Sequence, residues 1–126
     1  MTGVTYDAGA LIAGERGSAA VWALHRRLLE RGLRPTVPTA VLGQVWRDSR
    51  QVQLSRLLRG CRVEPLSEQQ ARLAGEALGA SEGKDLVDAV VVVTAAARGD
   101  LVVTSDPDDL RRIASAVGHR VELHTI

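Results

Sequence analysis

The chain has 126 residues, 45% of them hydrophobic, and a formal net charge of +1, which suits one globular domain that buries about two thirds of its unfolded surface. It shows no cleavable signal pattern and no apolar run long enough to span a bilayer, and its one cysteine, Cys61, excludes an internal disulfide. We therefore expect a single domain over residues 1–126 in the reducing cytoplasm. Only 2% of the residues are aromatic, so Ala, Val and Leu must fill the core.

Charge is distributed unevenly along the chain. Ten arginines stand against four acidic residues in residues 1–62, a net charge of +6, whereas six basic residues stand against eleven acidic ones in residues 63–126, a net charge of −5. A basic half and an acidic half suit a phosphate-rich ligand that meets a metal-binding centre. Arginine-rich helix faces that are simply solvated explain the same pattern equally well.

The first predicted element is a short strand over Met1–Asp7, in which Val4 and Tyr6 lead to Asp7, followed by a helix that begins in Ala8–Ala13. Asp7 then lies at the carboxyl end of a strand, where open parallel sheets bind their ligands. Aspartate is also a common helix N-cap, and one side chain can serve in both roles.

Apolar periodicity and turn residues outline six further elements before residue 84. In chain order these are an amphipathic helix over Ser18–Arg31, a strand over Arg34–Pro38, a helix over Thr39–Arg47 capped by Thr39, a helix over Gln51–Arg59, a strand over Cys61–Pro65 and a helix over Ser67–Leu78. The last helix opens with Ser-x-x-Gln, a capping-box pattern, and residues 80–83 form a polar break after it.

The stretch Lys84–Leu110 holds the most unusual acidic residue of the chain. Asp88 and Thr94 are the only polar residues within Leu86–Ala97, so the carboxylate of Asp88 sits among side chains that we expect to be buried. An unpaired buried carboxylate costs several kcal/mol or loses its charge. A bound metal ion is the most economical compensation.

We predict a helix over Leu86–Arg98, although the run Val90–Val93 by itself favours a strand. The stretch is too long for an average strand, and Gly99 is well placed as the residue that ends a helix. Asp85 is the expected N-cap, which puts Asp85 and Asp88 three residues apart on one face of the first turn.

The chain ends with a strand over Leu101–Ser105, a helix that opens at Asp106 with Pro107 in its first turn, and an edge strand over Val121–His124. Strands alternate with helices along the whole chain. This order predicts an α/β fold with a mostly parallel sheet of four to five strands and helices on both of its faces.

Three aspartates, Asp7, Asp88 and Asp106, fall at or next to the predicted junctions between strands and helices. Such junctions converge at one end of an α/β sheet, so carboxylates far apart in the sequence can meet there. Clustered carboxylates repel one another unless they share a divalent cation, and Mg²⁺ or Mn²⁺ prefers such oxygen ligands. The pattern predicts hydrolysis of phosphodiester bonds, because such an ion can bind a phosphate oxygen and lower the pKa of a water.

Other chemistries have little support in the sequence. The histidines, His25, His119 and His124, lack a metal-binding spacing, and Cys61 is expected to be a small core residue of its strand. With three aromatic side chains in all, base stacking cannot be the main mode of nucleic-acid binding. Arginine contacts to phosphates would have to supply it.

Four segments resemble the motifs of the PIN-domain family, and most closely those of its VapC-type toxins. They read, in chain order, YDAGALIAGER, VPTAVLGQVWR, DLVDAVVVVTAA and LVVTSDPDDL, and the likeness runs through the whole chain. Asp7 matches the family's first metal-binding aspartate, Asp88 the aspartate before its apolar third-motif helix, and Asp106 the acidic position after its fourth strand. The resemblance implies a three-layer α/β/α fold and a Mg²⁺- or Mn²⁺-dependent endoribonuclease toxin that inhibits translation. It also implies a homodimer that a small VapB-type antitoxin neutralises.

The chain departs from the family at Gln44, where the second motif usually supplies a glutamate. A glutamine can ligate weakly or accept a hydrogen bond from a metal-bound water, but it brings no charge. We expect Asp85 to supply the missing carboxylate, one turn away from Asp88; the other outcome is a weaker metal site. Asp109 is either a further ligand or the partner of Asp106 in a capping box.

Arg16, Arg47 and Arg50 are the residues we expect to contact the RNA backbone. Two other functions remain compatible with parts of the pattern. One is a catalytically weak or inactive PIN scaffold that binds RNA or a partner protein, which Gln44 favours. The other is a receiver-like signalling domain, although the chain lacks the acidic pair after the first strand and the lysine after the last strand that such domains use.

Overall fold

The computed structural model describes residues 3–126, and its centre is a sheet of five strands in the order β3-β2-β1-β4-β5. The strands are β1 (Val4–Tyr6), β2 (Thr36–Pro38), β3 (Arg62–Glu64), β4 (Leu101–Thr104) and β5 (Glu122–Thr125). All four neighbouring pairs are parallel, with Thr5 of β1 aligned with Thr36 on one side and Val102 on the other. The predicted parallel sheet is thus confirmed, and it has five strands.

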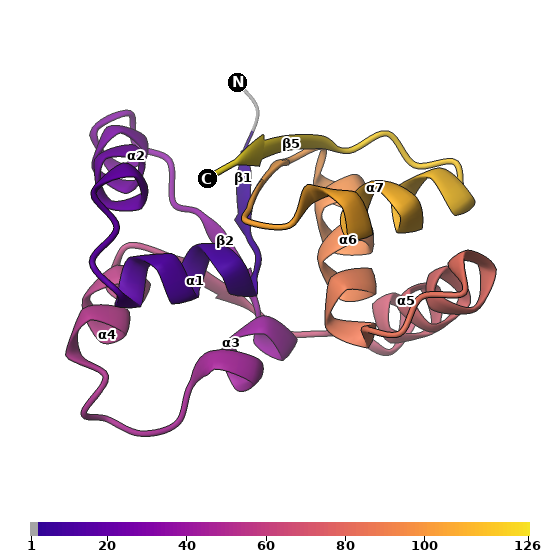
Figure 1. The fold of residues 1–126 in the computed structure, drawn as a ribbon, viewed down its shortest axis with the longest axis horizontal. Helices are drawn as coiled ribbons and strands as arrows, with labels where there is room; N and C mark the ends of the chain where they lie inside the picture. Colours follow the sequence, from indigo (N-terminus) through magenta and orange to yellow (C-terminus); the bar gives the residue numbers. More distant parts are fainter. Residues whose placement is uncertain (1–2) are drawn as a thin grey trace.

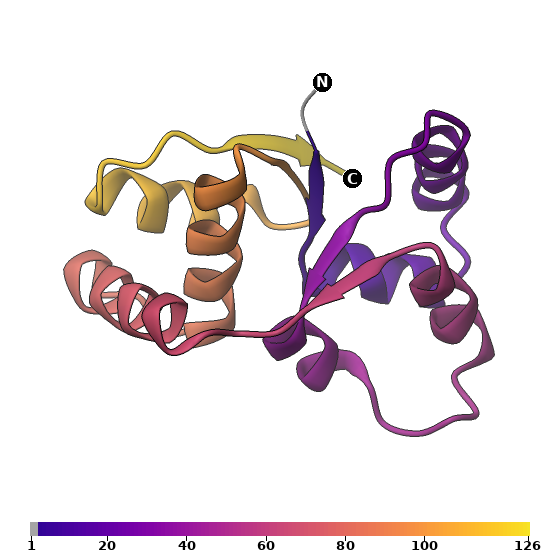
Figure 2. The ribbon, with the colours of Figure 1, turned by 180° about the vertical axis from the view of Figure 1, so that it is seen from behind.

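Seven helices flank the sheet within the described residues. They are α1 (Ala8–Glu15), α2 (Ala19–Glu30), α3 (Thr39–Val45), α4 (Val52–Arg59), α5 (Glu68–Ser81), α6 (Leu86–Arg98) and α7 (Pro107–Ala116). Helices α5, α6 and α7 pack against one another on one side of the strands, whereas α1, α2 and α4 lie on the other (Figure 1 and Figure 2). No helix between residues 3 and 126 combines the length and the apolarity needed to cross a membrane.

Helix α6 lies at the centre of the core. Seven consecutive residues, Ala89–Ala95, are buried, because the helix packs against α5, α7 and the strands β1, β2 and β4. An element buried on all sides is apolar all round, so packing overrides the strand preference of Val90–Val93. Gly99 ends the helix with a φ of 71°, as the sequence predicts.

Helix α3 differs from its prediction at both ends. It stops at Val45 because Trp46 adopts an extended backbone, and it begins after Pro38 without a side-chain cap. The expectation that Thr39 caps this helix is therefore wrong. The Oγ1 of Thr39 instead accepts a hydrogen bond from the backbone N–H of Leu66, at 3.3 Å.

Two boundaries between α4 and α6 also move. Helix α5 opens with the predicted capping box at Ser67, but it continues to Ser81 through part of the predicted break, and Glu82 ends it with a φ of 53°. Strand β3 is shorter than predicted, because Cys61 belongs to the turn before it. The thiol of Cys61 is buried as expected and donates to the carbonyl oxygen of Leu57 at 3.3 Å.

His25 connects helix α2 to strand β1 of the sheet through a hydrogen bond. Its side chain is buried, and its Nδ1 lies 2.9 Å from the hydroxyl oxygen of Tyr6 in β1. The ring of Trp22 packs edge-on against the imidazole, with the two centroids 5.7 Å apart. Burial lowers the pKa of His25, so the neutral imidazole is the form that the fold favours. His119 and His124 are exposed.

We expect the contribution of His25 to the free energy of unfolding to shrink as the pH falls below 6.5, the ordinary pKa of histidine. Below that pH the unfolded chain binds a proton that the folded chain, with its lowered pKa, does not, so acid favours unfolding. Urea unfolding of the wild type and of His25→Gln, at pH values from about 5 to 8, measures the difference. A difference that stays constant with pH would contradict this assignment.

Candidate active site

Asp7 lies directly after β1 and begins α1 as its N-cap. Its Oδ1 accepts a hydrogen bond from the backbone N–H of Ala10 at 2.9 Å, and the residue is only 6% exposed. Burial raises the pKa of Asp7, whereas hydrogen bonds from the Thr104 hydroxyl and from the N–H groups of Ala10 and Gly9 act in the opposite direction. Asp7 thus combines the two predicted roles, a helix cap and a carboxylate at the carboxyl edge of the sheet.

Thr104 connects the ends of β1 and β4. Its buried hydroxyl donates a hydrogen bond to the carboxylate of Asp7 and accepts one from the backbone N–H of Asp106 at 2.9 Å. One hydroxyl can serve both contacts because it is a donor in the first and an acceptor in the second. Thr104 thus lowers the pKa of the Asp7 carboxylate and contacts Asp106 through its backbone N–H, not through its carboxylate.

Asp85 and Asp88 come from the first turn of α6. Asp85 is the N-cap, as predicted, and its Oδ1 accepts from the backbone N–H groups of Val87 at 2.8 Å and Asp88 at 3.4 Å. Asp88 is half-buried, and its pKa is raised to about 7. Burial is the largest cause, and the negative charges of four other aspartates add to it, in the order Asp85, Asp109, Asp7 and Asp106.

Asp106 and Asp109 complete the group from the start of α7. The carboxylate of Asp106 makes no capping bond to the helix, and its backbone N–H is bound to Thr104. The capping box that the sequence allows between Asp106 and Asp109 is therefore wrong, because that N–H is the group Asp109 would have to bind. Asp109 instead raises the pKa of Asp106 through its charge, and it forms an ion pair with Arg112 at 2.6 Å.

Five carboxylates thus influence one another at one end of the sheet; we call them the carboxylate cluster, and they are Asp7, Asp85, Asp88, Asp106 and Asp109. A hard divalent cation fits this donor set, because carboxylate oxygens are its preferred ligands and its charge would offset their repulsion. Among residues 3–126, however, no three His, Cys, Asp or Glu side chains lie close enough together to form a complete metal-binding group. The cluster has the chemistry of a cation site, and its side chains would have to draw closer to bind one.

Gln44 is exposed on α3, a helix that contacts both α1 and α6. Asp7 is the N-cap of α1, and Asp88 lies in the first turn of α6. Gln44 is therefore on an element beside the cluster, as the motif predicts, but its amide adds no charge to the field that raises the pKa of Asp88.

Of the three arginines expected to contact RNA, two have their guanidinium groups bound within the protein. Arg47 turns back onto α3 and donates to the carbonyl oxygens of Trp46 at 2.7 Å and Gln44 at 2.9 Å. Arg50 forms an exposed ion pair with Asp48 at 2.8 Å. The guanidinium of Arg16 makes neither a hydrogen bond nor an ion pair within the described part of the chain.

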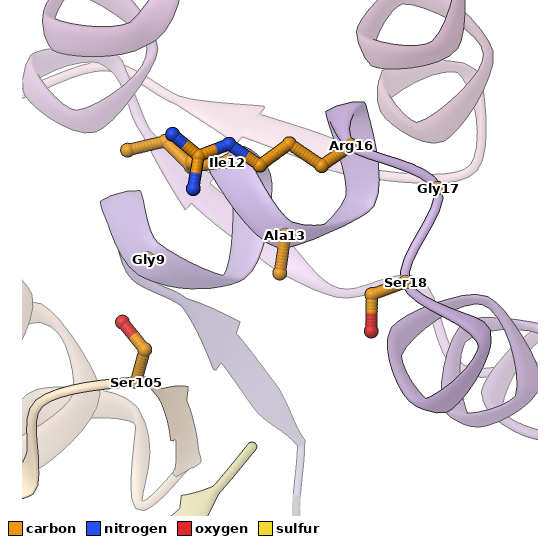
Figure 3. A pocket seen from close by; sticks show the side chains of 7 residues that line it. All are labelled: Gly9, Ile12, Ala13, Arg16, Gly17, Ser18 and Ser105. Atoms are coloured by element: carbon orange, nitrogen blue, oxygen red, sulfur yellow. The ribbon is translucent and has the colours of Figure 1, made fainter.

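Arg16 lines a cavity of about 370 Å³ between α1 and the end of β4 (Figure 3). Its lining residues are Gly9, Ile12, Ala13, Arg16, Gly17, Ser18 and Ser105. Ser105 directly precedes Asp106 in the chain, but none of the five residues of the carboxylate cluster lines the cavity. The cavity has one trace in the sequence, the run of small residues that follows Asp7.

Gly9 lets α1 approach the end of β4 closely. A Cβ at this position would overlap the Oγ of Ser105 and would lie 3.0 Å from its Cβ and 3.2 Å from its backbone nitrogen. The hydroxyl can rotate away, but the Cβ and the backbone cannot. Any larger residue at position 9 must therefore shift the segment that carries Asp106.

We expect Gly9→Ala to lower the free energy of unfolding by about 1–3 kcal/mol through this overlap. In an open helical position the same change stabilises by up to about 1 kcal/mol, because alanine favours the helix. Gly75→Ala in α5 is the matched control, since a Cβ there meets nothing within 4 Å. Urea unfolding of both variants tests the contrast, and a Gly9→Ala protein more stable than the wild type would refute it.

The fold and the site together define a class of protein: a parallel α/β protein that gathers carboxylates at the carboxyl ends of β1 and β4 and at the start of its buried helix. The sequence profile of the PIN domain matches residues 7–116, a span that begins at Asp7 and includes the whole carboxylate cluster. The chain belongs to the PIN domain family. No curated protein matches it in sequence.

Solved structures share its fold over almost the whole chain. VapBC2 from Rickettsia felis, bound to a DNA fragment from its promoter, is similar with a TM-score of 0.75 and 14% identity, covering 98% of each chain. FitAB bound to an IR36 DNA fragment has a TM-score of 0.68 and 14% identity, covering 97% of this chain and 94% of the other. A toxin–antitoxin complex from Klebsiella pneumoniae has a TM-score of 0.65 and 18% identity, covering 84% and 88%. The expected three-layer α/β/α fold is confirmed.

Proposed function

We propose that the chain is a metal-dependent endoribonuclease toxin of a toxin–antitoxin pair, which hydrolyses phosphodiester bonds of RNA and so inhibits translation. The observation that carries the proposal is the carboxylate cluster, in which Asp88 has its pKa raised to about 7. Membership of the PIN domain family supports nuclease chemistry. The similar structures from toxin–antitoxin complexes support a VapB-type antitoxin as partner. A homodimer in the cytoplasm completes the proposal.

The residues that would hold Mg²⁺ or Mn²⁺ are Asp7, Asp88 and Asp106, with Asp85, Asp109 and, through a water, Gln44 as further candidates. When bound, the ion would polarise a phosphoryl oxygen and lower the pKa of a water. A carboxylate oxygen of Asp88 can hold a proton near neutral pH and release it when a cation arrives, because burial and flanking charges raise its pKa. The Thr104 hydroxyl binds the backbone N–H of Asp106 and so keeps the start of α7 close to the end of β4.

The RNA strand is proposed to pass beside α1. Arg16 can bind a backbone phosphate there, since its guanidinium has no partner within residues 3–126 and it lines a cavity together with Ser105, the residue before Asp106. Arg47 and Arg50 remain candidates, but each would first have to leave the group it binds now, the carbonyl of Gln44 or the carboxylate of Asp48.

Mg²⁺ or Mn²⁺ should raise the free energy of unfolding, and by more at about pH 8 than at about pH 5.5, because Asp88 is protonated below its pKa of about 7. At a free ion concentration near 100 times Kd the rise is about 2.7 kcal/mol. Calorimetric scans with the ion and with EDTA measure it. Asp7→Asn should lose most of the rise, and an equal rise in that variant would rule out Asp7 as a ligand.

Asp7→Asn should abolish toxicity and reduce RNA cleavage by roughly 10²-fold or more. Asparagine caps helices as well as aspartate does, so the change removes a charge without removing the start of α1. Glu68→Gln is the matched control, because Glu68 is exposed and pairs with Arg72 on α5, outside the cluster. Growth of expressing cells and sequencing of their RNA ends provide the measurement. Equal growth arrest from the wild type and from Asp7→Asn would contradict the proposed metal-dependent nuclease activity.

A second candidate function is a catalytically weak or inactive PIN scaffold that binds RNA or a partner protein. Gln44 favours it, as does the lack of a complete metal-binding group among residues 3–126. Calorimetric titration with Mg²⁺ and Mn²⁺ decides between the two functions. If neither ion binds and the protein cleaves no RNA, the scaffold function is supported. In the same titration Asp85→Asn tests whether Asp85 compensates for Gln44, and unchanged ion affinity and cleavage would remove that role.

A further inference from the structure

The positive charge of the first half of the chain is concentrated in two short segments. Residues 19–34 carry four arginines and one glutamate, and residues 52–62 carry three arginines and no acid. Together they account for the whole net charge of +6, because the other charged groups of residues 1–62 are three acids and three arginines. Helix α2 and the loop after it, with α4 and β3, therefore form the basic part of the protein.

These two segments pack against each other. A Cβ at Gly60, the residue after α4, would lie 2.7 Å from Nε2 of His25 in α2, so the two helices are in close contact there. Arg34 donates from Nη2 to the carbonyl oxygen of Cys61 at 2.8 Å. The backbone N–H of Arg62 donates to the carbonyl oxygen of Pro35, also at 2.8 Å. Arg26 and Arg56, one from each segment, line the same cavity, and we call the exposed side of these two segments the basic surface.

The arginines of this basic surface are all exposed; they are Arg26, Arg27, Arg31, Arg34, Arg56, Arg59 and Arg62. None of them takes part in an ion pair within residues 3–126, although five other arginines of the chain do. Seven unpaired positive charges with one acid among them repel one another and oppose folding. An anionic ligand would offset that repulsion.

A cavity of about 450 Å³ lies within the basic surface, between α2 and α4. It is lined by Trp22, His25, Arg26, Leu29, Glu30 and Arg56. The guanidinium of Arg56 lies over the ring of Trp22, 5.4 Å from its centroid. Arginine beside an aromatic ring is the combination that accommodates phosphates and bases along a single strand. The carboxylates of an acidic peptide would bind the arginines, but such a peptide has no ring to place in the cavity beside Trp22.

We propose that the basic surface is a second binding site for single-stranded RNA, separate from the carboxylate cluster, with a base in the cavity beside Trp22 and phosphates on Arg26 and Arg56. The site rests on the proposed function only in the choice of RNA as ligand. It needs no metal, because none of its residues belongs to the cluster.

The path between the two sites runs along α1. Ser18 lines the cavity that opens beside Ser105, and it also caps α2. Figure 3 shows Ser18 at the start of α2, with Arg16 just before it in the connection from α1. An RNA strand that runs from Ser105 along that cavity would meet the start of α2, and a contact with the basic surface would then anchor a long RNA while one bond is cut.

The test measures RNA binding in EDTA, so that the carboxylate cluster cannot contribute through a metal. A Trp46→Phe background leaves Trp22 as the only indole, and its fluorescence reports binding at the cavity. Anisotropy of a labelled, unstructured RNA of roughly 12 nucleotides measures affinity.

The double variant Arg26→Gln with Arg56→Gln removes two proposed phosphate contacts. Arg72→Gln with Arg120→Gln makes the same change in net charge on the acidic half of the chain and is the matched control.

We expect RNA to quench Trp22, and the first double variant to bind roughly tenfold more weakly, with the slope of log affinity against log salt reduced by about 1.4. The control should match the wild type within about twofold. Equal losses in both double variants, or RNA binding without any change in Trp22 fluorescence, would overturn the proposal. Tighter binding of a polyglutamate peptide than of RNA would overturn it in favour of an acidic protein partner.

The outcome separates this site from the proposed nuclease. Binding at Trp22 in a protein that cleaves no RNA would leave the second site standing and remove the proposed function. Cleavage of long RNA with equal KM by the wild type and by Arg26→Gln with Arg56→Gln would remove the second site alone.

Discussion

The repulsion among the five carboxylates at the carboxyl ends of β1 and β4 is the constraint on which the rest of the structure depends. The fold does not let them separate: α6 is held by the burial of Ala89–Ala95, and Asp7 by its bonds to the first turn of α1 and to Thr104. The charge is tolerated in the free protein because Asp88 takes up a proton below its pKa of about 7. A cation is the alternative way to offset the repulsion.

A buried carboxylate is not by itself a sign of a site, as Asp100 illustrates. It is 5% exposed, but Arg98 donates to it at 3.0 Å and the hydroxyl of Thr5 at 2.8 Å. Its charge is therefore compensated within the protein, at the end of α6 opposite to Asp88. The difference between the two aspartates is that Asp100 pairs with Arg98, whereas Asp88 forms no ion pair within the part of the chain that the structure describes.

Local patterns predicted those features for which one physical preference dominates. Asp7 and Asp85 cap helices because a short acceptor at that position satisfies backbone N–H groups, and Gly99 ends α6 because glycine adopts the positive φ that the position requires. The expectation for Thr39 was wrong because its side chain had two available partners. Thr39 bonds to Leu66 instead of its own helix. Sequence spacing alone does not rank such competing hydrogen bonds.

The sequence by itself determined the parallel α/β order and the identity of the aspartates at its junctions, because both follow from the periodicity and composition of neighbouring residues. The imbalance of charge between the two halves was also visible in it. Only the tertiary structure decided that the charge of Asp109 acts on Asp88, that Thr104 contacts both Asp7 and the backbone of Asp106, and that Arg26 of α2 and Arg56 of α4 line one cavity. Those facts depend on distances between residues far apart in the chain, which are set by how the helices pack on the sheet.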